Sequence, residues 1–315
     1  MAIITQQFLA AVFTNFSAFF QNVFTTSQVG VPNLCLETES TTAAESYNWL
    51  GSHPRMREWT DERKPSGATS NNFTIRARDW EASIEVDRDE FLFDKLNLVK
   101  PRISGLAHEA QRHPRELAYS LLAGGFTAKA WDGKNFFADH TKAVPGGTAW
   151  LNNNLGAIAL DSNGMKTAFA TLRAANDDRG RPFDFPLSAS NTRLIVGPKQ
   201  EANARTLLNS ESYVGAASGG AVGPSATFAK NIWKGIAELD VTAYITDNSW
   251  FLAFIGDADA RALLFQWHKK PELSQLTNPN TSDAVFMRKK YYYGTDAIYN
   301  VGYGNFAQIV GSSVA

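Results

Sequence analysis

The sequence contains almost no cysteine, because Cys35 is the only one in 315 residues. A single cysteine cannot form a disulfide within the chain, which argues against a disulfide-stapled secreted fold and favours a reducing compartment. The acidic neighbours Glu37 and Glu39 disfavour a thiolate at this position. We therefore expect Cys35 to be structural.

Long apolar runs and N-terminal basic residues are also missing. No stretch reaches the roughly 18 consecutive apolar residues that span a bilayer. No lysine or arginine precedes Arg55, so the N-terminal segment lacks the charged region of a signal peptide and the basic face of a membrane-surface helix. The sequence therefore predicts no membrane partner.

Neither sign of charge is in excess, because 30 Lys and Arg against 31 Asp and Glu give a net charge of −1. This balance excludes a globally basic nucleic-acid-binding protein, although a local basic face is compatible with it. The basic and aromatic run 288–293 could contact nucleic acid, but an ordinary strand with a solvated face is favoured. Apolar residues make up 44% of the chain, which indicates a folded protein with one large core or two smaller ones.

Motifs for catalysis and metal binding are absent as well. His108 and His113 resemble the zinc-protease helix motif, but they stand about 140° apart on a helix, whereas the motif needs positions i and i+4. His53, His140 and His268 lie in separate segments without other metal ligands nearby. No nucleophile elbow, Walker loop or dinucleotide-binding glycine motif occurs. We predict a protein that is not an enzyme, with no catalytic residues, no metal site and no cofactor.

What is present begins with a segment rich in phenylalanine. Apolar residues recur at i, i+3 and i+4 between Phe8 and Phe24, which predicts a helix with one broad apolar stripe. The six phenylalanines on this stripe must be covered, either by the chain's own core or by a neighbouring subunit. The polar stretch 25–46 that follows is expected to be extended.

Two charged, β-like stretches then flank a turn. Residues 55–63 and 73–88 lie on either side of the segment 64–72, which is rich in Ser, Gly and Asn. Seven basic and seven acidic residues lie between Arg55 and Arg88. A two-stranded ribbon is marginal alone in water, so it needs a partner surface unless it is an ordinary surface hairpin. This pattern favours a subunit of a larger assembly over an enzyme.

The hydrophobic alternation changes phase within the second of these stretches. Apolar residues have odd numbers from Phe73 to Ala77 and even numbers from Trp80 to Val86. A shift of one residue turns every side chain to the opposite face unless a bulge or twist intervenes. We therefore expect an extended arm to join a packed domain near residues 78–79.

The rest of the chain predicts an α+β fold without repeats or an interdomain linker. A long helix is expected to end at Gly124, with Pro101 in its first turn. Pro114 is expected to kink or break this helix near His113. The stretch 212–226, rich in Gly, Ala and Ser, is expected to be a mobile loop. Helices are also predicted at 162–176 and 201–209, and strands at 194–198, 238–245, 250–255, 284–293 and 303–310.

Several short segments, taken in order, carry a family resemblance. They are Tyr-Asn-Trp-Leu-Gly at 47–51, Pro-Arg-Met-Arg-Glu-Trp at 54–59, Glu-Val-Asp-Arg-Asp at 85–89, His-Pro-Arg-Glu-Leu at 113–117, an Asp-Gly, Phe-Phe and Asp-His block at 132–140, Leu-Ile-Val-Gly-Pro at 194–198, and the stretch 285–304. In their order and spacing they resemble the Mu-like major head subunit (gpT) family of tailed-phage major capsid proteins.

The resemblance implies a Hong Kong 97-type phage capsid fold. This α+β fold has an N-terminal arm, an extended E-loop hairpin, a peripheral domain with a long spine helix, and an axial domain. The arm would be 1–46, the E-loop 47–86, the peripheral domain 87–148 with 272–315, and the axial domain 149–271. The predicted hairpin and long helix agree with this arrangement.

The resemblance also implies a function in assembly. Hexamers and pentamers of the chain would form an icosahedral shell around phage double-stranded DNA, assembled in the bacterial cytoplasm and found in the virion capsid. Implied partners are a scaffold or protease protein, a portal and a decoration protein. Because the arm begins close to Met1, a separate scaffold is expected. Intersubunit contacts are expected from residues of the arm and E-loop, namely Phe13, Phe16, Phe20, Arg57, Trp59, Arg63, Lys64, Phe73, Arg76 and Arg78.

Three alternatives remain open at this point. An encapsulin-like nanocompartment shell would share the fold but enclose enzymes. A tail or minor virion protein would form rings or tubes without a closed shell. A soluble α+β hydrolase or binding protein would be a monomer or dimer with a deep polar pocket.

Overall fold

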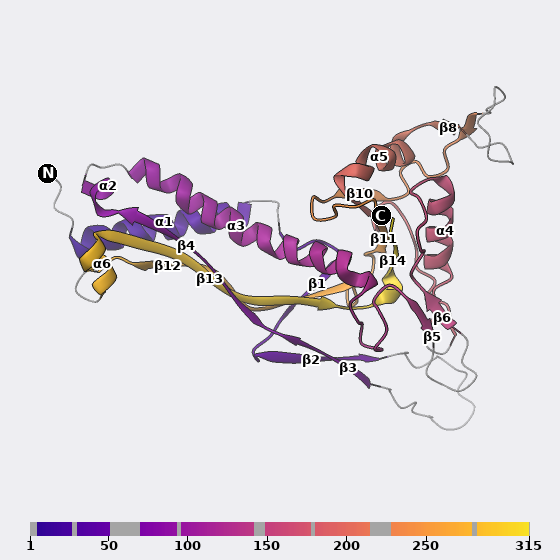
Figure 1. Ribbon diagram of the computed structural model, residues 1–315, viewed down its shortest axis with the longest axis horizontal. Helices are drawn as coiled ribbons and strands as arrows, with labels where there is room; N and C mark the ends of the chain where they lie inside the picture. Colours follow the sequence, from indigo (N-terminus) through magenta and orange to yellow (C-terminus); the bar gives the residue numbers. More distant parts are fainter. Residues whose placement is uncertain are drawn as a thin grey trace.

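The computed structural model describes residues 5–26, 30–50, 70–92, 96–141, 149–177, 180–214, 228–278 and 282–314. An elongated limb of long helices and strands extends from a more compact body that holds the C-terminal strand (Figure 1). A thin two-stranded ribbon runs beneath the point where the two parts meet. The chain is therefore α+β, as the sequence predicts.

The elongated limb is built on a four-stranded sheet with the order β1-β12-β13-β4. The pairing of β1 with β12 is parallel, and β13 is antiparallel to both β12 and β4. The strands are β1 Cys35–Glu39, β12 Leu263–Leu276, β13 Lys290–Tyr303 and β4 Arg78–Asp87. Two long helices, α1 Gln6–Thr26 and α3 Leu96–Ala123, cover one face of this sheet (Figure 1).

The phenylalanine-rich helix α1 is covered by its own chain. Its buried residues are Leu9, Val12, Phe16 and Phe20, and they belong to one hydrophobic cluster with the first half of α3 and with β13. The ring of Phe16 meets Tyr293 edge-on at 5.6 Å between centroids. Among the described residues α1 alone is long and apolar enough to cross a membrane, a test that a core helix also passes.

The helix α3 differs from its prediction at both prolines. It spans 28 residues, about 42 Å at ~1.5 Å per residue, and continues through Pro114 without a break. A proline inside a helix costs about 3 kcal/mol, and burial on both sides of Pro114, from Val99 to Leu122, offsets this cost. The predicted break near His113 is therefore wrong. Pro101 lies in the second turn of α3 rather than in the first.

The compact body is built on a second sheet with the order β10-β7-β11-β14. The inner strand β11 confirms the predicted strand at 250–255 and is buried along its whole length, which agrees with its continuous apolar sequence. The strands are β7 Thr192–Val196, β10 Glu238–Val241, β11 Trp250–Phe254 and β14 Ile309–Ser312, and the accompanying helices are α4 Ser162–Arg173 and α5 Glu201–Asn209. The predictions of helices at 162–176 and 201–209 are confirmed.

The structure corrects two of the predicted strands and adds one long strand that was not predicted. Residues predicted as one strand at 284–293 form α6 Asp283–Arg288 and then the start of β13. The predicted strand 303–310 is divided by a short helix at Phe306–Gln308, and only β14 continues it. The missed strand is β12, where Pro271 lies near a register shift that obscures the alternation.

Short elements complete the fold. They are α2 Arg88–Leu92, η1 Gly124–Phe126, β5 Asp139–Thr141, β6 Ala149–Asn152, η2 Pro198–Gln200, β8 Ser212–Val214 and β9 Phe228–Lys230. The α3 helix ends at the Gly124 stop, as predicted. The start of the predicted mobile loop, at 212–214, is a strand, and 215–227 lie outside the described residues.

Candidate assembly interface

A two-stranded hairpin stands apart from both large sheets. Its strands, β2 Ala44–Leu50 and β3 Ser70–Arg76, pair antiparallel with Ala44 opposite Arg76. The predicted strand 55–63 and the turn residues 64–69 lie outside the described residues. The predicted turn extends to Asn72, but β3 already begins at Ser70.

The hairpin joins the elongated limb at Ala77. This residue lies between β3 and β4, and its N–H donates to Ala43 O at 2.9 Å. Upstream Ile75 is buried, and downstream Trp80, Ala82, Ile84 and Val86 pack with residues of the two long helices. The predicted phase change is confirmed, one residue earlier than the expected position. Because β3 pairs with no strand but β2 in the described part of the chain, while β4 pairs with β13, Ala77 is the junction between ribbon and sheet.

The base of the hairpin is held to the sheet by a few contacts. Tyr47 Oη shares a hydrogen bond with Thr38 Oγ1 at 2.8 Å and donates a longer one to Gln266 Oε1 at 3.4 Å. Burial raises the pKa of Tyr47. Ile75 packs on Gly302. A Cβ added to Gly302 would lie 2.5 Å from the terminal carbon of Ile75. A small backbone site on β13 therefore receives the hairpin.

Among the residues predicted to contact other subunits, those that the structure describes fall into three groups. Phe16 and Phe20 are buried in the chain's own core, which is the alternative that the sequence left open. Phe13 and Phe73 are half-buried, and Phe73 packs against the main core. Arg76 and Arg78 are exposed at the junction. Arg57, Trp59, Arg63 and Lys64 lie outside the described residues.

A line of acidic side chains follows the free edge of the limb sheet. The strand β4 is an outer strand of that sheet, and its exposed positions carry Asp79, Glu81, Glu85 and Asp87. Among the described residues only Glu85 of these four forms an ion pair, with Lys290. These acids stand at alternate positions in the sequence, and the sequence-based list of contact residues did not include them.

Apolar side chains are exposed at the far end of the same limb. Phe286 and Met287 on α6 are 70% and 77% exposed, and α6 lies at the tip of the limb in Figure 1. Neighbouring large apolar side chains that remain in water commonly mark a contact surface. Both residues fall within the predicted strand 284–293, so the sequence pattern did not indicate this patch.

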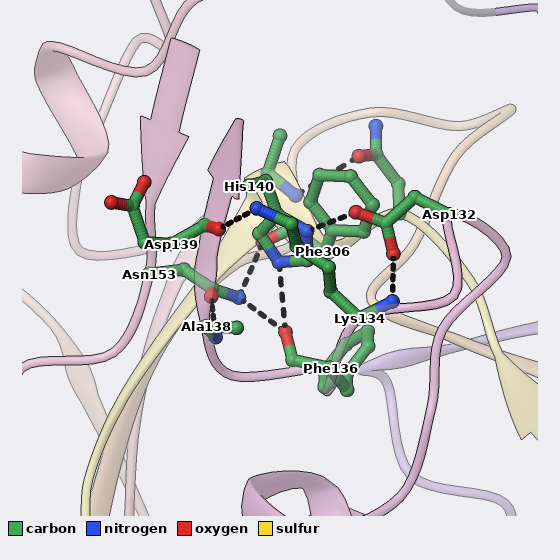
Figure 2. A network of polar contacts seen from close by, with 10 residues as sticks. Asp132, Lys134, Phe136, Ala138, Asp139, His140, Asn153 and Phe306 are labelled. Carbon is green, nitrogen blue, oxygen red and sulfur yellow. Dashed lines mark hydrogen bonds and ion pairs between the residues drawn. The ribbon is translucent and has the colours of Figure 1, made fainter. Parts of the chain in front are cut away.

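The Asp-Gly, Phe-Phe and Asp-His block folds into a buried polar network (Figure 2). His140 Nδ1 lies 2.6 Å from Asp132 Oδ2, and the imidazole stacks on Phe306 at 3.7 Å between ring centroids. Asn153 Nδ2 donates to Phe136 O at 2.9 Å and to Phe306 O at 3.1 Å. These bonds tie the loop after α3 to the C-terminal segment, so the network is a structural joint.

A second polar contact connects α3 with the compact body. Arg115 Nη2 donates to Asp240 Oδ1 at 2.7 Å, and Tyr119 Oη donates to the other carboxylate oxygen. Burial, reinforced by the charge of Asp240, raises the pKa of Tyr119. The tyrosine therefore stays a neutral donor, and α3 is fixed to β10.

The part of the chain that the structure describes holds no cluster of His, Cys, Asp or Glu that could bind a metal ion. His113 Nδ1 lies 2.7 Å from Tyr299 Oη, which gives this histidine a packing partner. Cys35 is buried in β1, and burial together with Glu37 raises its pKa. The thiol is therefore protonated and structural, as expected.

The sequence matches one protein family over most of its length. The family described as Mu-like prophage major head subunit gpT matches residues 9–157 and 242–315. The major capsid protein of Escherichia phage Mu is 27% identical over 162 residues, which are 51% of this chain and 53% of that protein. The Mu-like prophage FluMu major head subunit of Haemophilus influenzae is 22% identical over 304 residues, 96% of this chain and 72% of that protein. The chain thus spans about half the length of the phage Mu protein.

Solved structures share the fold. The procapsid of bacteriophage JBD30 superposes with a TM-score of 0.59 at 21% identity, over 99% of this chain and 77% of that chain. A virus-like particle from Pyrococcus furiosus superposes with a TM-score of 0.51 at 11% identity, over 95% and 98%. The predicted Hong Kong 97-type fold is confirmed.

Proposed function

The chain belongs to the Mu-like prophage major head subunit gpT family, and from this premise we propose that it assembles into the hexamers and pentamers of an icosahedral phage head. This is a family of structural capsid proteins, so no catalytic step is assigned to the chain. The match covers the arm helix, the hairpin, α3 and the long strands of the limb, which are the parts that this function uses.

The observation that carries the proposal is the hairpin. Among the described residues its two strands pair with each other and with no other strand. Their contacts with the limb sheet come from Tyr47, Phe73, Ile75 and Arg76. An isolated two-stranded ribbon is marginally stable in water. A surface on a neighbouring subunit would supply the missing packing.

The domains follow from the same proposal. Residues 1–46 form the arm, 47–86 the E-loop, 87–148 with 272–315 the peripheral domain, and 149–271 the axial domain. The elongated limb and the compact body of Figure 1 support a division into a peripheral and an axial domain, with two exceptions to these bounds: β12 already begins at Leu263 in the limb sheet, and β14 Ile309–Ser312 belongs to the sheet of the body. The helix of the arm packs on α3, so part of the arm is an integral layer of the peripheral domain.

Contacts between subunits are proposed for the arm, the E-loop and the limb tip. Burial of apolar area contributes ~25 cal/mol per Å², and Phe13 and the exposed Phe286 and Met287 offer such area. Individual surface ion pairs contribute little, but repeated around a closed shell they set register and curvature. The charged and aromatic E-loop contacts proposed are Arg57, Trp59, Arg63, Lys64, Phe73, Arg76 and Arg78.

The remaining partners are proposed from the family. Packaged double-stranded DNA fills the shell, a portal occupies one vertex, a scaffold or protease protein acts during assembly, and a decoration protein binds the outside. The finished protein resides in the virion capsid after assembly in the bacterial cytoplasm.

Shortening the hairpin tests the assembly proposal. Residues 51–69 are replaced by a two-residue Asn-Gly turn, which keeps β2 and β3 paired. Negative-stain microscopy and light scattering of the parent chain should show shells or capsomer-sized rings, and the shortened variant should form neither. A matched variant with Gly, Ser and Asn residues in place of 215–227 should still assemble. Equal assembly of the parent and the shortened hairpin would contradict the role of the hairpin.

A nanocompartment shell is the second candidate, favoured by the superposition on the virus-like particle from Pyrococcus furiosus. The contents of the particles distinguish a nanocompartment from a phage head. Particles purified from cells that carry the rest of the phage genes should contain DNA. Particles filled with one enzyme and no DNA would favour the nanocompartment.

A further inference from the structure

A cleft lies between the long helix α3 and the sheet of the limb. It has a volume of about 100 Å³ and is open to solvent. It falls between the hydrophobic cluster around α1 and the main core, at a level where small side chains leave room. The lining residues are Trp80, Glu81 and Ala82 of β4, Glu109, Ala110 and His113 of α3, Pro271 of β12, and Thr295, Ala297 and Tyr299 of β13.

One end of the cleft is a fixed aromatic wall. The rings of Trp80 and His113 lie 4.3 Å apart in an edge-to-face arrangement. Trp80 Nε1 donates to Tyr299 O at 3.0 Å, and Tyr299 Oη lies 2.7 Å from His113 Nδ1. Because each of these rings has a hydrogen-bond partner within the wall, the wall is preorganised for an apolar or aromatic group.

The lining also contains a polar group that the isolated chain leaves unsatisfied. Thr295 is 6% exposed, and its hydroxyl has no hydrogen-bond partner among the described residues. Buried hydroxyl groups are normally paired. An occupant that brings a hydrogen-bond donor or acceptor to this part of the cleft would complete the site.

The surroundings of the cleft are acidic. Glu81 and Glu109 line it, and the acids of β4 continue along the free edge of the sheet. Glu109 pairs with Arg112 at 2.5 Å, while Glu81 has no ion pair among the described residues. An occupant with basic groups beside an apolar ring therefore fits this charge pattern.

The chain itself carries a segment of this chemistry. Residues 55–63 are predicted to be extended, and successive side chains of a strand alternate between its two faces. Arg55, Arg57, Trp59 and Arg63 then share one face, on which Asp61 is the only acid. The indole N–H of tryptophan is a hydrogen-bond donor.

The occupant is expected to come from another copy. From the junction at Ala77, β4 runs toward the tip of the limb, and β3 runs to the opposite side (Figure 1). The far end of β3, at Ser70, is about 23 Å away from Ala77, because a strand rises ~3.3 Å per residue. The segment between β2 and β3 thus starts on the side of the junction away from the cleft.

We propose that this cleft receives Trp59 from the hairpin of a second copy of the chain, with Arg57 facing Glu81. The inference rests on the proposed assembly function and deepens it, because it names one receptor site for the hairpin. It also explains why the segment 55–63 combines a large aromatic side chain with arginines.

A disulfide experiment tests the contact in assembled particles. The background is low, because the single native cysteine, Cys35, is buried. The double variant Arg57→Cys and Glu81→Cys should form covalent oligomers larger than dimers on non-reducing gels. The matched control pairs Arg57→Cys with Asp87→Cys, which lies on the same exposed face of β4, about 20 Å further along the strand. It should cross-link at least tenfold less.

A cavity-filling variant tests the same cleft without changing charge. Ala297→Leu should occupy the cleft and reduce the yield of particles at least tenfold, while Ala297→Ser should assemble like the parent. Circular dichroism and thermal unfolding of the unassembled subunit check that Ala297→Leu is folded. If this variant does not fold, the disulfide experiment alone decides.

The outcomes separate the inference from the function on which it rests. Particles that form normally but show no cross-link specific to positions 57 and 81 would overturn the inference and leave the assembly proposal intact. A cross-link confined to single chains would also overturn it, because the occupant would then be the chain's own hairpin. A parent chain that forms no particles would contradict the assembly proposal and the inference together.

Discussion

At the scale of single residues, the buried polar network around Asn153 and His140 fixes the joint between the loop after α3 and the C-terminal segment. Both side chains are fully buried. Asn153 donates to the distant Phe306 carbonyl, and the His140 ring stacks on the Phe306 ring. The sequence shows Asp132 and His140 eight positions apart, but nothing in it indicates that the loop folds back over Phe306. From the sequence alone, His140 is therefore an isolated histidine.

Replacing Asn153 should destabilise the subunit. Asn153→Leu would leave the part-buried Ala138 N–H without its partner and would remove one of the two donors of the Phe306 carbonyl, which keeps the Ile309 N–H. An unpaired buried polar group costs about 1–3 kcal/mol, so we expect a loss of about 1–3 kcal/mol in the free energy of unfolding, measured by urea denaturation of the unassembled subunit. The exposed residue Asn163 provides the control, because Asn163→Ala should change this free energy by less than about 0.5 kcal/mol. A loss equally small for Asn153→Leu would contradict the structural role.

The same network predicts a response to acid. Burial alone would raise the pKa of Asp132, but the hydrogen bond and charge of His140 outweigh it and hold the pKa of Asp132 below its usual value. A carboxyl whose pKa is lowered by folding adds stability above its ordinary pKa, near 3.9, and loses it as the pH falls through the folded value. Urea unfolding between pH 5 and pH 2.5 should therefore show a steeper loss of stability for the parent than for Asp132→Asn. Parallel pH profiles for the two proteins would refute this account.

At the scale of elements, the sequence predicts the helices and strands whose hydrophobic pattern is set by residues close together in the chain. The helices α4 and α5 follow from 3.6-residue periodicity, and the ribbon-to-sheet junction follows from the change of parity near Ala77. The unbroken α3 could not be predicted, because the cost of Pro114 is local while the burial that offsets it comes from β13 and the compact body. The strand β12 was missed for a similar reason, since Pro271 and the shifted register hide its alternation.

The seat of the hairpin on β13 can be tested with one glycine. In Gly302→Val the new side chain would meet Ile75 and Phe73 at distances of 2.5 to 3.0 Å. These are flexible side-chain ends, so the hairpin should move away while the sheets stay folded. Hydrogen exchange should then become at least fivefold faster for amides of 70–76 and stay unchanged in β11.

The matched control replaces a glycine that has open space around it. At Gly105 in α3 a Cβ would meet nothing within 4 Å, so Gly105→Ala should leave exchange in the hairpin unchanged. It should also raise the free energy of unfolding by about 0.5–1 kcal/mol, because alanine is the better helix former. Unchanged hairpin exchange in Gly302→Val would show that Gly302 does not seat the hairpin.

At the scale of the whole molecule, the candidate contact surface could be predicted only in part. Charge counts and the Ser, Gly and Asn-rich turn identify the hairpin, and the ordered family segments identify the fold. The acidic edge of β4, the exposed pair Phe286 and Met287, and the cleft beneath α3 depend on how distant strands pair. The phenylalanine stripe of α1 illustrates the limit, because periodicity predicts a buried face but cannot say which chain buries it.

The central claim is that many copies of this chain close into a shell. The most direct measurement is the mass and symmetry of the purified full chain, with and without a candidate scaffold protein, by light scattering and electron cryomicroscopy. The account predicts closed particles, or free capsomers, whose images show fivefold and sixfold symmetry. A monodisperse 34.6 kDa monomer that persists at high concentration with the scaffold present would contradict it.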